Sequence, residues 1–202
     1  MGFTVYRPDG ILKNMKKIET RLATRESILD AANRVLVEKG AEGFTLDAVA
    51  KEAAISKGGL LYHFPSKNGL IQGMIARSIT QVDDALREEL ALSGGDYLTA
   101  YVRASFRTNV EPEHVSRALF AAIANDPSLL EPLRARFFRI QGEIAAAAPT
   151  EEIGTLLRLC MDGMWYAHLY QFAPPSLELR NRMRDTLLAF LQDIKHSADL
   201  KS

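Results

Sequence analysis

The stretch "ISKGGLLYHFPSK", Ile55 to Lys67, contains two adjacent glycines where the neighbouring residues predict a short helix. Ser56 is a good N-cap for this helix, and Pro65 ends it. A glycine inside a helix costs roughly 1 kcal/mol relative to alanine. Gly58 and Gly59 therefore mark either a loop or a helix whose backbone another molecule must approach closely.

The composition is that of an ordinary globular protein with a sizeable core, because 47% of the 202 residues are hydrophobic and 25% are charged. No apolar run approaches the ~18 residues that a membrane-spanning helix needs, and the charged N-terminus does not resemble a secretory signal. The single cysteine, Cys160, excludes an internal disulfide and a multi-cysteine metal site. We therefore expect a cytoplasmic protein with no membrane contact, no metal ion and no cofactor.

Basic residues are concentrated at the N-terminus, although the formal net charge of the whole chain is zero. Residues 1–25 hold six lysines and arginines against two acidic residues, a net charge of 6 − 2 = +4. We expect residues 1–23 to form a flexible basic arm that suits an anionic partner. A solvated tail with scattered lysines explains the charge equally well. The basic residues of the arm include Lys13, Lys16, Lys17 and Arg21.

Helical spacing of apolar residues extends along nearly the whole chain, and strand patterns are almost absent. A first helix is predicted over about 24–39, with Gly40 as its stop. Thr45 is the expected N-cap of a second helix, and a long fourth helix follows Ser66. Proline-containing breaks then separate five more predicted helices, over about 96–109, 112–124, 128–147, 150–172 and 176–197. The sequence therefore predicts an all-α fold of about nine helices.

The second and third predicted helices, about 46–53 and 57–64, have the size of a helix-turn-helix. In that motif the second helix lies in the major groove of DNA. Glycines in it let the backbone approach the DNA closely, and the helix N-terminus opened by Ser56 and Lys57 favours phosphate. Taken singly, Gly58-Gly59 marks a loop more often than anything else, so the hypothesis depends on the ordered combination of residues.

The segment "RESILDAANRVLVEKGAEGFTLDAVAKEAAISKGGLLYHFPSKNGLI", Arg25 to Ile71, resembles the DNA-binding segment of the TetR family of transcriptional regulators. The resemblance covers about a quarter of the chain. The shared features are the opening arginine, the paired alanines, the glycine stop, the threonine cap, and the Ser-Lys-Gly, Leu-Tyr-x-His-Phe and Ser-Lys runs. The sequence departs from the pattern at Ala54, where the family usually has glycine, and mildly at Ile55 and Asn68.

The resemblance implies an N-terminal three-helix DNA-binding domain over 24–70 and a C-terminal helical ligand-binding and dimerisation domain over 71–202. It implies a regulator, commonly a repressor, that binds double-stranded operator DNA as a homodimer through its last two helices. Base reading is expected at the start of the third helix, and backbone contacts are expected around it. The positions that would meet DNA are Thr45, Lys57, Gly58, Gly59, Leu60, Tyr62, His63 and Lys67.

The resemblance also implies a pocket for a small, largely apolar or aromatic effector in the C-terminal domain. Methionines and aromatic residues make an adaptable apolar cavity, although such residues more often form ordinary core. Cys160 is expected to be a buried, inert thiol within an apolar helix face. The candidate ligand-binding residues are Phe106, Phe120, Phe137, Met161, Met164, Trp165 and His168.

Three alternatives were weighed against this hypothesis. An enzyme is disfavoured because the sequence has no HExxH, GxSxG, Walker or GxGxxG pattern, and its four histidines lack ligand spacing. A monomer with unusually thick terminal helices is the alternative to a dimer. A helical protein-interaction module without DNA binding is the remaining alternative, but such a module has no use for a Gly-Gly helix between two capping serines.

Overall fold

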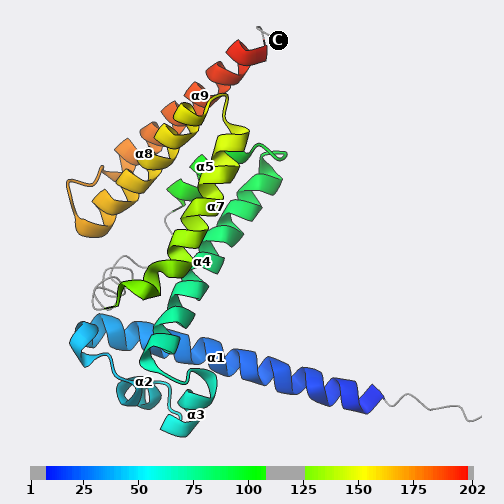
Figure 1. The fold of residues 1–202 in the computed structure, drawn as a ribbon, viewed down its shortest axis with the longest axis vertical. Helices are drawn as coiled ribbons and strands as arrows, with labels where there is room; N and C mark the ends of the chain where they lie inside the picture. Colours follow the sequence, from blue (N-terminus) through cyan, green and yellow to red (C-terminus); the bar gives the residue numbers. More distant parts are fainter. Residues whose placement is uncertain (1–7, 108–125, 200–202) are drawn as a thin grey trace, which may run out of the picture. The chain divides into compact units, whose positions relative to one another are not determined.

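The computed structural model describes residues 8–107 and 126–199, and these residues form helices without any strand (Figure 1). The predicted all-α fold is therefore confirmed for the described residues. The chain divides into two compact units, Met1–Met74 and Ile75–Ser202. The division falls inside one helix, α4 (Lys67–Leu92), and each unit is described by itself below.

The N-terminal unit begins with a longer helix than the sequence predicted. Helix α1 spans Pro8–Gly43 and contains one non-helical residue, Gly40, with φ 65°. The arm predicted over residues 1–23 is therefore helical from Pro8 onward. Proline is well tolerated in the first turn of a helix, and the residues that follow include many good helix formers such as lysine, leucine and methionine.

The predicted apolar face of α1 is confirmed as the core of the N-terminal unit. Helices α2 (Leu46–Glu52) and α3 (Lys57–His63) follow α1 and lie next to each other beside it (Figure 1). Leu60 of α3 and Leu70 of α4 complete this core. The fully buried residues that α1 and the loop after it contribute are Ile28, Leu29, Ala31, Ala32, Val35, Leu36 and Phe44.

The C-terminal unit contains the rest of α4 and four further α-helices among its described residues. These are α5 (Tyr97–Phe106), α7 (Glu131–Ala147), α8 (Glu151–Tyr170) and α9 (Leu177–Asp199), with a short 3-10 helix, η1 (Pro127–Leu130), before α7. The helix predicted over 112–124 lies outside the described residues. We call the main apolar cluster of this unit the core cluster; its buried members are Leu98, Tyr101, Val102, Phe106, Ile140, Ile144, Leu157, Met161, Met164 and Leu191.

Side-chain caps begin α8 and α9. Thr150 accepts a hydrogen bond from the Ile153 N–H at 3.4 Å, and Ser176 accepts one from the Leu179 N–H at 3.2 Å. Each cap satisfies a backbone donor that the first turn leaves without an intrahelical acceptor. The helix starts in the C-terminal half are therefore encoded locally.

Candidate nucleic-acid interface

Two capping side chains define the start of α2 and of α3. Thr45 Oγ1 accepts a hydrogen bond from the Ala48 N–H at 3.2 Å, and Ser56 Oγ accepts one from the Gly59 N–H at 3.0 Å. Both predicted N-caps are therefore confirmed. Since a cap fixes the first turn of its helix, Ser56 determines where α3 begins and how its N-terminal N–H groups are presented.

The turn between α2 and α3 depends on a left-handed residue. Ala54 has φ 54°, in the region that favours glycine. The Ile55 N–H donates to the Ala50 carbonyl at 3.0 Å, which closes the C-terminus of α2. The unusual alanine at this position therefore adopts the conformation that the more common glycine would provide, and it carries the steric cost of its Cβ.

The candidate DNA-contacting residues divide into exposed and buried groups. Tyr62 is 66% exposed, and Gly59 and His63 are half-buried. The prediction that Leu60 reads bases is wrong, because its side chain is completely buried in the core of the unit. Leu60 is instead one of the residues that anchor α3 in the buried core of the N-terminal unit. The exposed candidates are Thr45, Lys57, Gly58, Tyr62 and Lys67.

Nothing in the described part of the chain requires glycine at position 58. Gly58 is exposed and helical, and a Cβ added there would meet only the Ser56 Oγ, at 4.0 Å. Gly73 is the opposite case, because its added Cβ would lie 2.4 Å from Cε1 of Phe64. Packing therefore explains Gly73, whereas Gly58 leaves a backbone surface open to an external molecule.

Positive charge from two helices gathers around the C-terminal end of α3. The Arg21 guanidinium lies 5.4 Å from the ring centroid of Tyr62, and the Arg25 guanidinium lies 5.0 Å from that of Phe64. Tyr62 also meets the His63 ring edge-on at 5.2 Å between centroids. Guanidinium groups over aromatic faces are held in place while remaining able to bind phosphate.

The electrostatic environment keeps His63 neutral over a wider pH range than usual. Burial lowers the pKa of His63, and the positive charges of Arg21 and Arg25 lower it further. The neutral ring offers one donor and one acceptor nitrogen. The neutral His63 therefore adds hydrogen-bonding atoms to a surface that also carries the positively charged Arg21, Arg25 and Lys67. Lys67 Nζ lies 5.6 Å from the ring centroid of Phe44.

Sequence reasoning missed two features of this surface. Arg25 was identified only as the residue that opens the first helix, and Arg21 only as part of a flexible arm. Their four-residue spacing, which places both on one helix face, was the available signal. The pairing of Lys57 Nζ with Asp47 Oδ2 at 2.9 Å had no comparable signal, because it joins two helices across the turn.

The candidate ligand-binding residues are only partly brought together. Phe106, Met161 and Met164 are buried members of the core cluster, while Phe137 and His168 are half-buried. Trp165 does not join them, because it is exposed and meets Tyr166 edge-on at 5.0 Å between ring centroids. Phe120 lies outside the described residues.

Helix α8 exposes an apolar stripe that the described residues do not cover. Leu156, Leu159, Tyr166 and Tyr170 recur at helical spacing and are all exposed. Cys160 lies among them and is exposed too, so the prediction of a buried thiol is wrong for the single chain. Phe190 is exposed on α9. Exposed apolar surface of this extent marks an interaction site.

The described residues lack two structural features. They contain no group of three or more histidine, cysteine, aspartate or glutamate side chains that could hold a metal ion. None of their helices is both long and apolar enough to cross a membrane.

Comparison with known proteins covers both units. Residues 28–74 match the family described as bacterial regulatory proteins, tetR family, and residues 95–192 match the tetracyclin repressor-like, C-terminal domain. The first match contains α2 and α3 with both caps. The second contains all the described candidate ligand-binding residues and the exposed stripe of α8.

Curated relatives and solved structures agree with these matches. The HTH-type transcriptional regulator BetI of Burkholderia thailandensis is 27% identical over 193 residues, which cover 87% of this chain and 98% of that protein. The HTH-type transcriptional repressor KstR of Mycolicibacterium smegmatis is 29% identical over 69% of this chain and 61% of its own length. The crystal structure of the multidrug binding protein EbrR complexed with malachite green shares the fold, with a TM-score of 0.63 at 23% identity over 83% of this chain and 97% of that one.

Proposed function

The chain belongs to the TetR family of transcriptional regulators, and we propose that it is a repressor that leaves its operator DNA when a small molecule binds. Members of this family are DNA-binding regulators rather than enzymes. The operator, the effector and the repressing role are the parts that we propose.

Gly58 is the observation that carries the proposal of direct DNA contact. It costs helix stability, it is exposed, and the fold has no need of it. Close approach of α3 to DNA provides the missing reason, since the first turn of a recognition helix meets base edges in the major groove. Lys57 and Gly58 are the proposed base-reading positions, with half-buried Gly59 beside them.

Contacts to the DNA backbone are proposed for the residues around that helix. Tyr62 and Lys67 are exposed, and His63 is half-buried beside them. Thr45 is exposed at the N-terminus of α2, where backbone N–H groups favour phosphate. Arg21 and Arg25 add positive charge next to Tyr62 and Phe64. Such contacts position the protein without specifying sequence, and they make binding sensitive to salt.

An apolar or aromatic effector is supported by the composition of the core cluster. Phe106, Met161 and Met164 provide a polarizable lining that can adapt to a ligand. EbrR, which shares the fold, has been crystallised with the aromatic dye malachite green. KstR, a relative in sequence, is named a repressor. We propose that a ligand in the core cluster opposes DNA binding, with a coupling of typically ~1–3 kcal/mol.

A homodimer through α8 and α9 is supported by the exposed stripe. Leu156, Leu159, Tyr166 and Tyr170 would leave water by packing against the same stripe of a second copy. A two-fold dimer presents two copies of α3, which suits a palindromic operator whose half-sites lie about one helical turn, or a multiple, apart. The dimer thus accounts for the apolar stripe and provides the second reading helix.

The decisive experiment is equilibrium binding to the DNA immediately upstream of the gene, followed by fluorescence anisotropy over a series of salt concentrations. We expect a dissociation constant below about 1 µM that competitor DNA does not abolish and that rises with salt. Tyr62→Ala should weaken binding, whereas Phe138→Ala, at an exposed aromatic residue of α7 outside both the DNA-contacting residues and the α8 stripe, should leave it unchanged. A selection of genomic fragments would find an operator located elsewhere. Sequence-independent binding to every fragment, unaffected by Tyr62→Ala, would refute the proposal and favour a protein-interaction module.

A further inference from the structure

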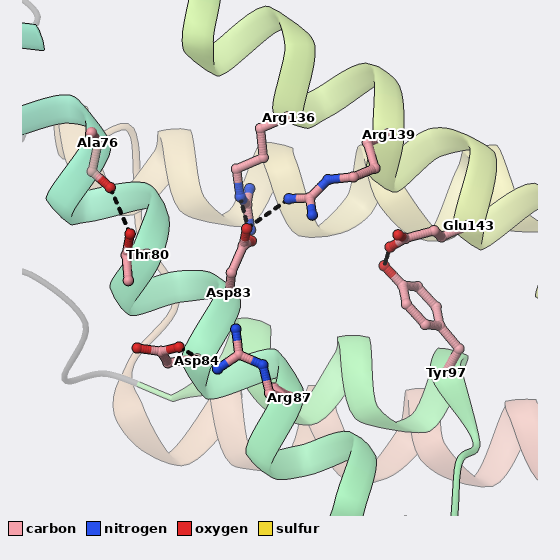
Figure 2. A network of polar contacts seen from close by, with 9 residues as sticks. All are labelled: Ala76, Thr80, Asp83, Asp84, Arg87, Tyr97, Arg136, Arg139 and Glu143. Atoms are coloured by element: carbon pink, nitrogen blue, oxygen red, sulfur yellow. Dashed lines mark hydrogen bonds and ion pairs between the residues drawn. The ribbon is translucent and has the colours of Figure 1, made fainter. Parts of the chain in front are cut away.

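Two arginines of α7 converge on one carboxylate of α4 (Figure 2). Arg136 Nε donates to Asp83 Oδ1 at 2.8 Å, and Arg139 Nη2 donates to Asp83 Oδ2 at 2.6 Å. Each oxygen of the carboxylate therefore has its own charged donor. We call these three residues the Asp83 cluster.

The Asp83 cluster is sheltered from water on one side. The side chain of Arg136 is 12% exposed and that of Asp83 is 22% exposed, while Arg139 lies further out at 53%. Burial acts to raise the pKa of Asp83, but the hydrogen bonds from Arg139 and Arg136 together hold that pKa below its usual value. The carboxylate is therefore charged at neutral pH, and a sheltered pair of this kind is screened less by salt than an exposed one.

Two other acidic residues of α4, Asp84 and Glu88, do not make a comparable connection, and the sheltered Glu89 lies 3.6 Å from Arg107 rather than from a residue of α7. Asp84 accepts a hydrogen bond from Arg87, on the same helix, at 2.5 Å (Figure 2). Glu88 accepts one from Arg107 at 2.8 Å, but both side chains are well exposed, and exposed ion pairs contribute little. Asp83 thus provides a sheltered ionic tie between α4 and α7 that Asp84 and Glu88 do not.

Arg136 also interacts with groups at the core cluster. Burial raises the pKa of Tyr101 to about 12, and the charge of Asp162 adds to this shift while that of Arg136 opposes it. Arg136 likewise acts against the raised pKa of Asp162. Tyr101 is itself a member of the core cluster, together with Met161. Arg136 lies one helical turn before Ile140, a buried member of the core cluster on the same helix. The inner arginine therefore adjoins both α4 and the region where the effector is proposed to bind.

We propose that the Asp83 cluster transmits effector binding to α4: a ligand that enters the core cluster draws Arg136 away from Asp83 and so releases the helix. This inference rests on the function proposed above. It uses the fact that α4 is a single helix, Lys67–Leu92, whose first residues belong to the DNA-binding unit. When a partly buried carboxylate loses one of its two charged donors, arrangements between the paired and the separated state are high in free energy. The contact between Asp83 and Arg136 therefore suits a two-state switch. Asp83, Arg136 and Arg139 are positioning residues in this scheme.

The test compares Asp83→Asn with Asp84→Asn, which removes the same charge from the next residue of the same helix. Both are measured without effector, by anisotropy with the wild-type operator, at a temperature where circular dichroism shows each variant fully folded. We expect Asp83→Asn to raise the dissociation constant at least about fivefold, and Asp84→Asn to change it less than about twofold. An unchanged or lower dissociation constant for Asp83→Asn would overturn the proposal.

A double-mutant comparison tests whether Asp83 and Arg136 affect DNA binding through one shared contact or each through a general structural effect. Arg136→Gln should weaken DNA binding as Asp83→Asn does, and the double variant should be no weaker than either single one, because both changes break the same contact. Additive losses would contradict a shared contact. If Asp83→Asn does not fold, Arg139→Gln removes only the outer donor and allows the same comparison.

Hydrogen exchange keeps the test independent of the operator. Asp83→Asn should speed amide exchange in residues 75–92 relative to Asp84→Asn, since α4 loses its tie to α7. If the wild-type chain bound no DNA specifically, the proposed function would fail, and this measurement alone would decide whether the Asp83 cluster restrains α4. Equal exchange in the two variants would rule out that restraint.

Discussion

Lys57 at the start of α3 and Asp47 of α2 form an ion pair, with Lys57 Nζ donating to Asp47 Oδ2 at 2.9 Å. Both side chains are largely exposed, so the pair contributes little to stability. The ion pair between Lys57 and Asp47 instead affects DNA binding. Lys57 is a proposed base-reading residue, and any DNA group that it contacts must compete with the carboxylate of Asp47.

Removing that carboxylate should strengthen DNA binding. Asp47→Asn deletes a negative charge that would face the DNA phosphates and releases Lys57 from its partner. We expect a roughly threefold lower dissociation constant, the equivalent of about 0.6 kcal/mol, at low salt. Asp185→Asn, an exposed acid of α9, changes the net charge equally and should have no such effect. Equal changes in both variants would mean that only net charge matters.

Substitution at Gly58 should separate folding from binding. Gly58→Ala removes the helix cost of glycine without a steric clash, so the free energy of unfolding should rise by roughly 1 kcal/mol in urea titrations. Operator affinity should fall in the same variant, because the new methyl group faces the DNA. Gly73→Ala is the matched control and should destabilise the protein, since its methyl group would collide with Phe64. A Gly58→Ala variant that binds the operator like wild type would disprove close approach at this position.

Replacing Ala54 with glycine should stabilise the turn before α3. Ala54→Gly relieves a left-handed backbone conformation that costs about 1–2 kcal/mol for alanine, less the entropy that glycine loses on folding. We expect a net gain of about 0.5–1 kcal/mol in unfolding free energy. Ala53→Gly, at the neighbouring residue with φ −78°, should lose stability instead. A loss in both variants would show that the Ala54 backbone is unstrained.

Stability should fall at acidic pH partly through His63. Its pKa is lowered in the folded protein by burial and by Arg21 and Arg25, so the unfolded chain binds this proton more readily. Stability therefore rises with pH until the pH exceeds the unfolded value of 6.5, and it declines as the pH falls below that value. His63→Gln should flatten this part of the profile in urea titrations repeated across pH. An unchanged slope would exclude His63 as its source.

The exposed stripe of α8 should be needed for association and not for folding. Leu156 is 66% exposed in the single chain, so Leu156→Glu should leave the helical circular dichroism signal intact. The same change should place a charge in the dimer interface and yield monomers in sedimentation experiments. Leu157→Glu, at the adjacent buried residue, should unfold the C-terminal unit. A Leu156→Glu chain that sediments like wild type would place the interface elsewhere.

Much of the candidate DNA-binding surface could be predicted from local sequence patterns. Thr45 and Ser56 cap helices wherever they precede a helical run, because the hydrogen bond involves residues only three positions away. The apolar spacing of Ile28, Leu29 and Val35 likewise predicted the buried face of α1. Local patterns were insufficient for Leu60, since a leucine in a short helix faces either the core or the solvent, according to the helices around it.

The sequence by itself determined the family and most of the helices, because caps, breaks and 3.6-residue periodicity act over a few residues. It did not determine the start of α1, which lies at Pro8 rather than near residue 24. The tertiary structure decided which side chains share a surface. It buried Leu60, exposed Trp165 and Cys160, and placed Arg25 over Phe64. It also brought Asp83 together with Arg136 from more than fifty positions along the chain. Such contacts depend on how helices pack, and packing depends on the shapes of many side chains at once rather than on any one segment.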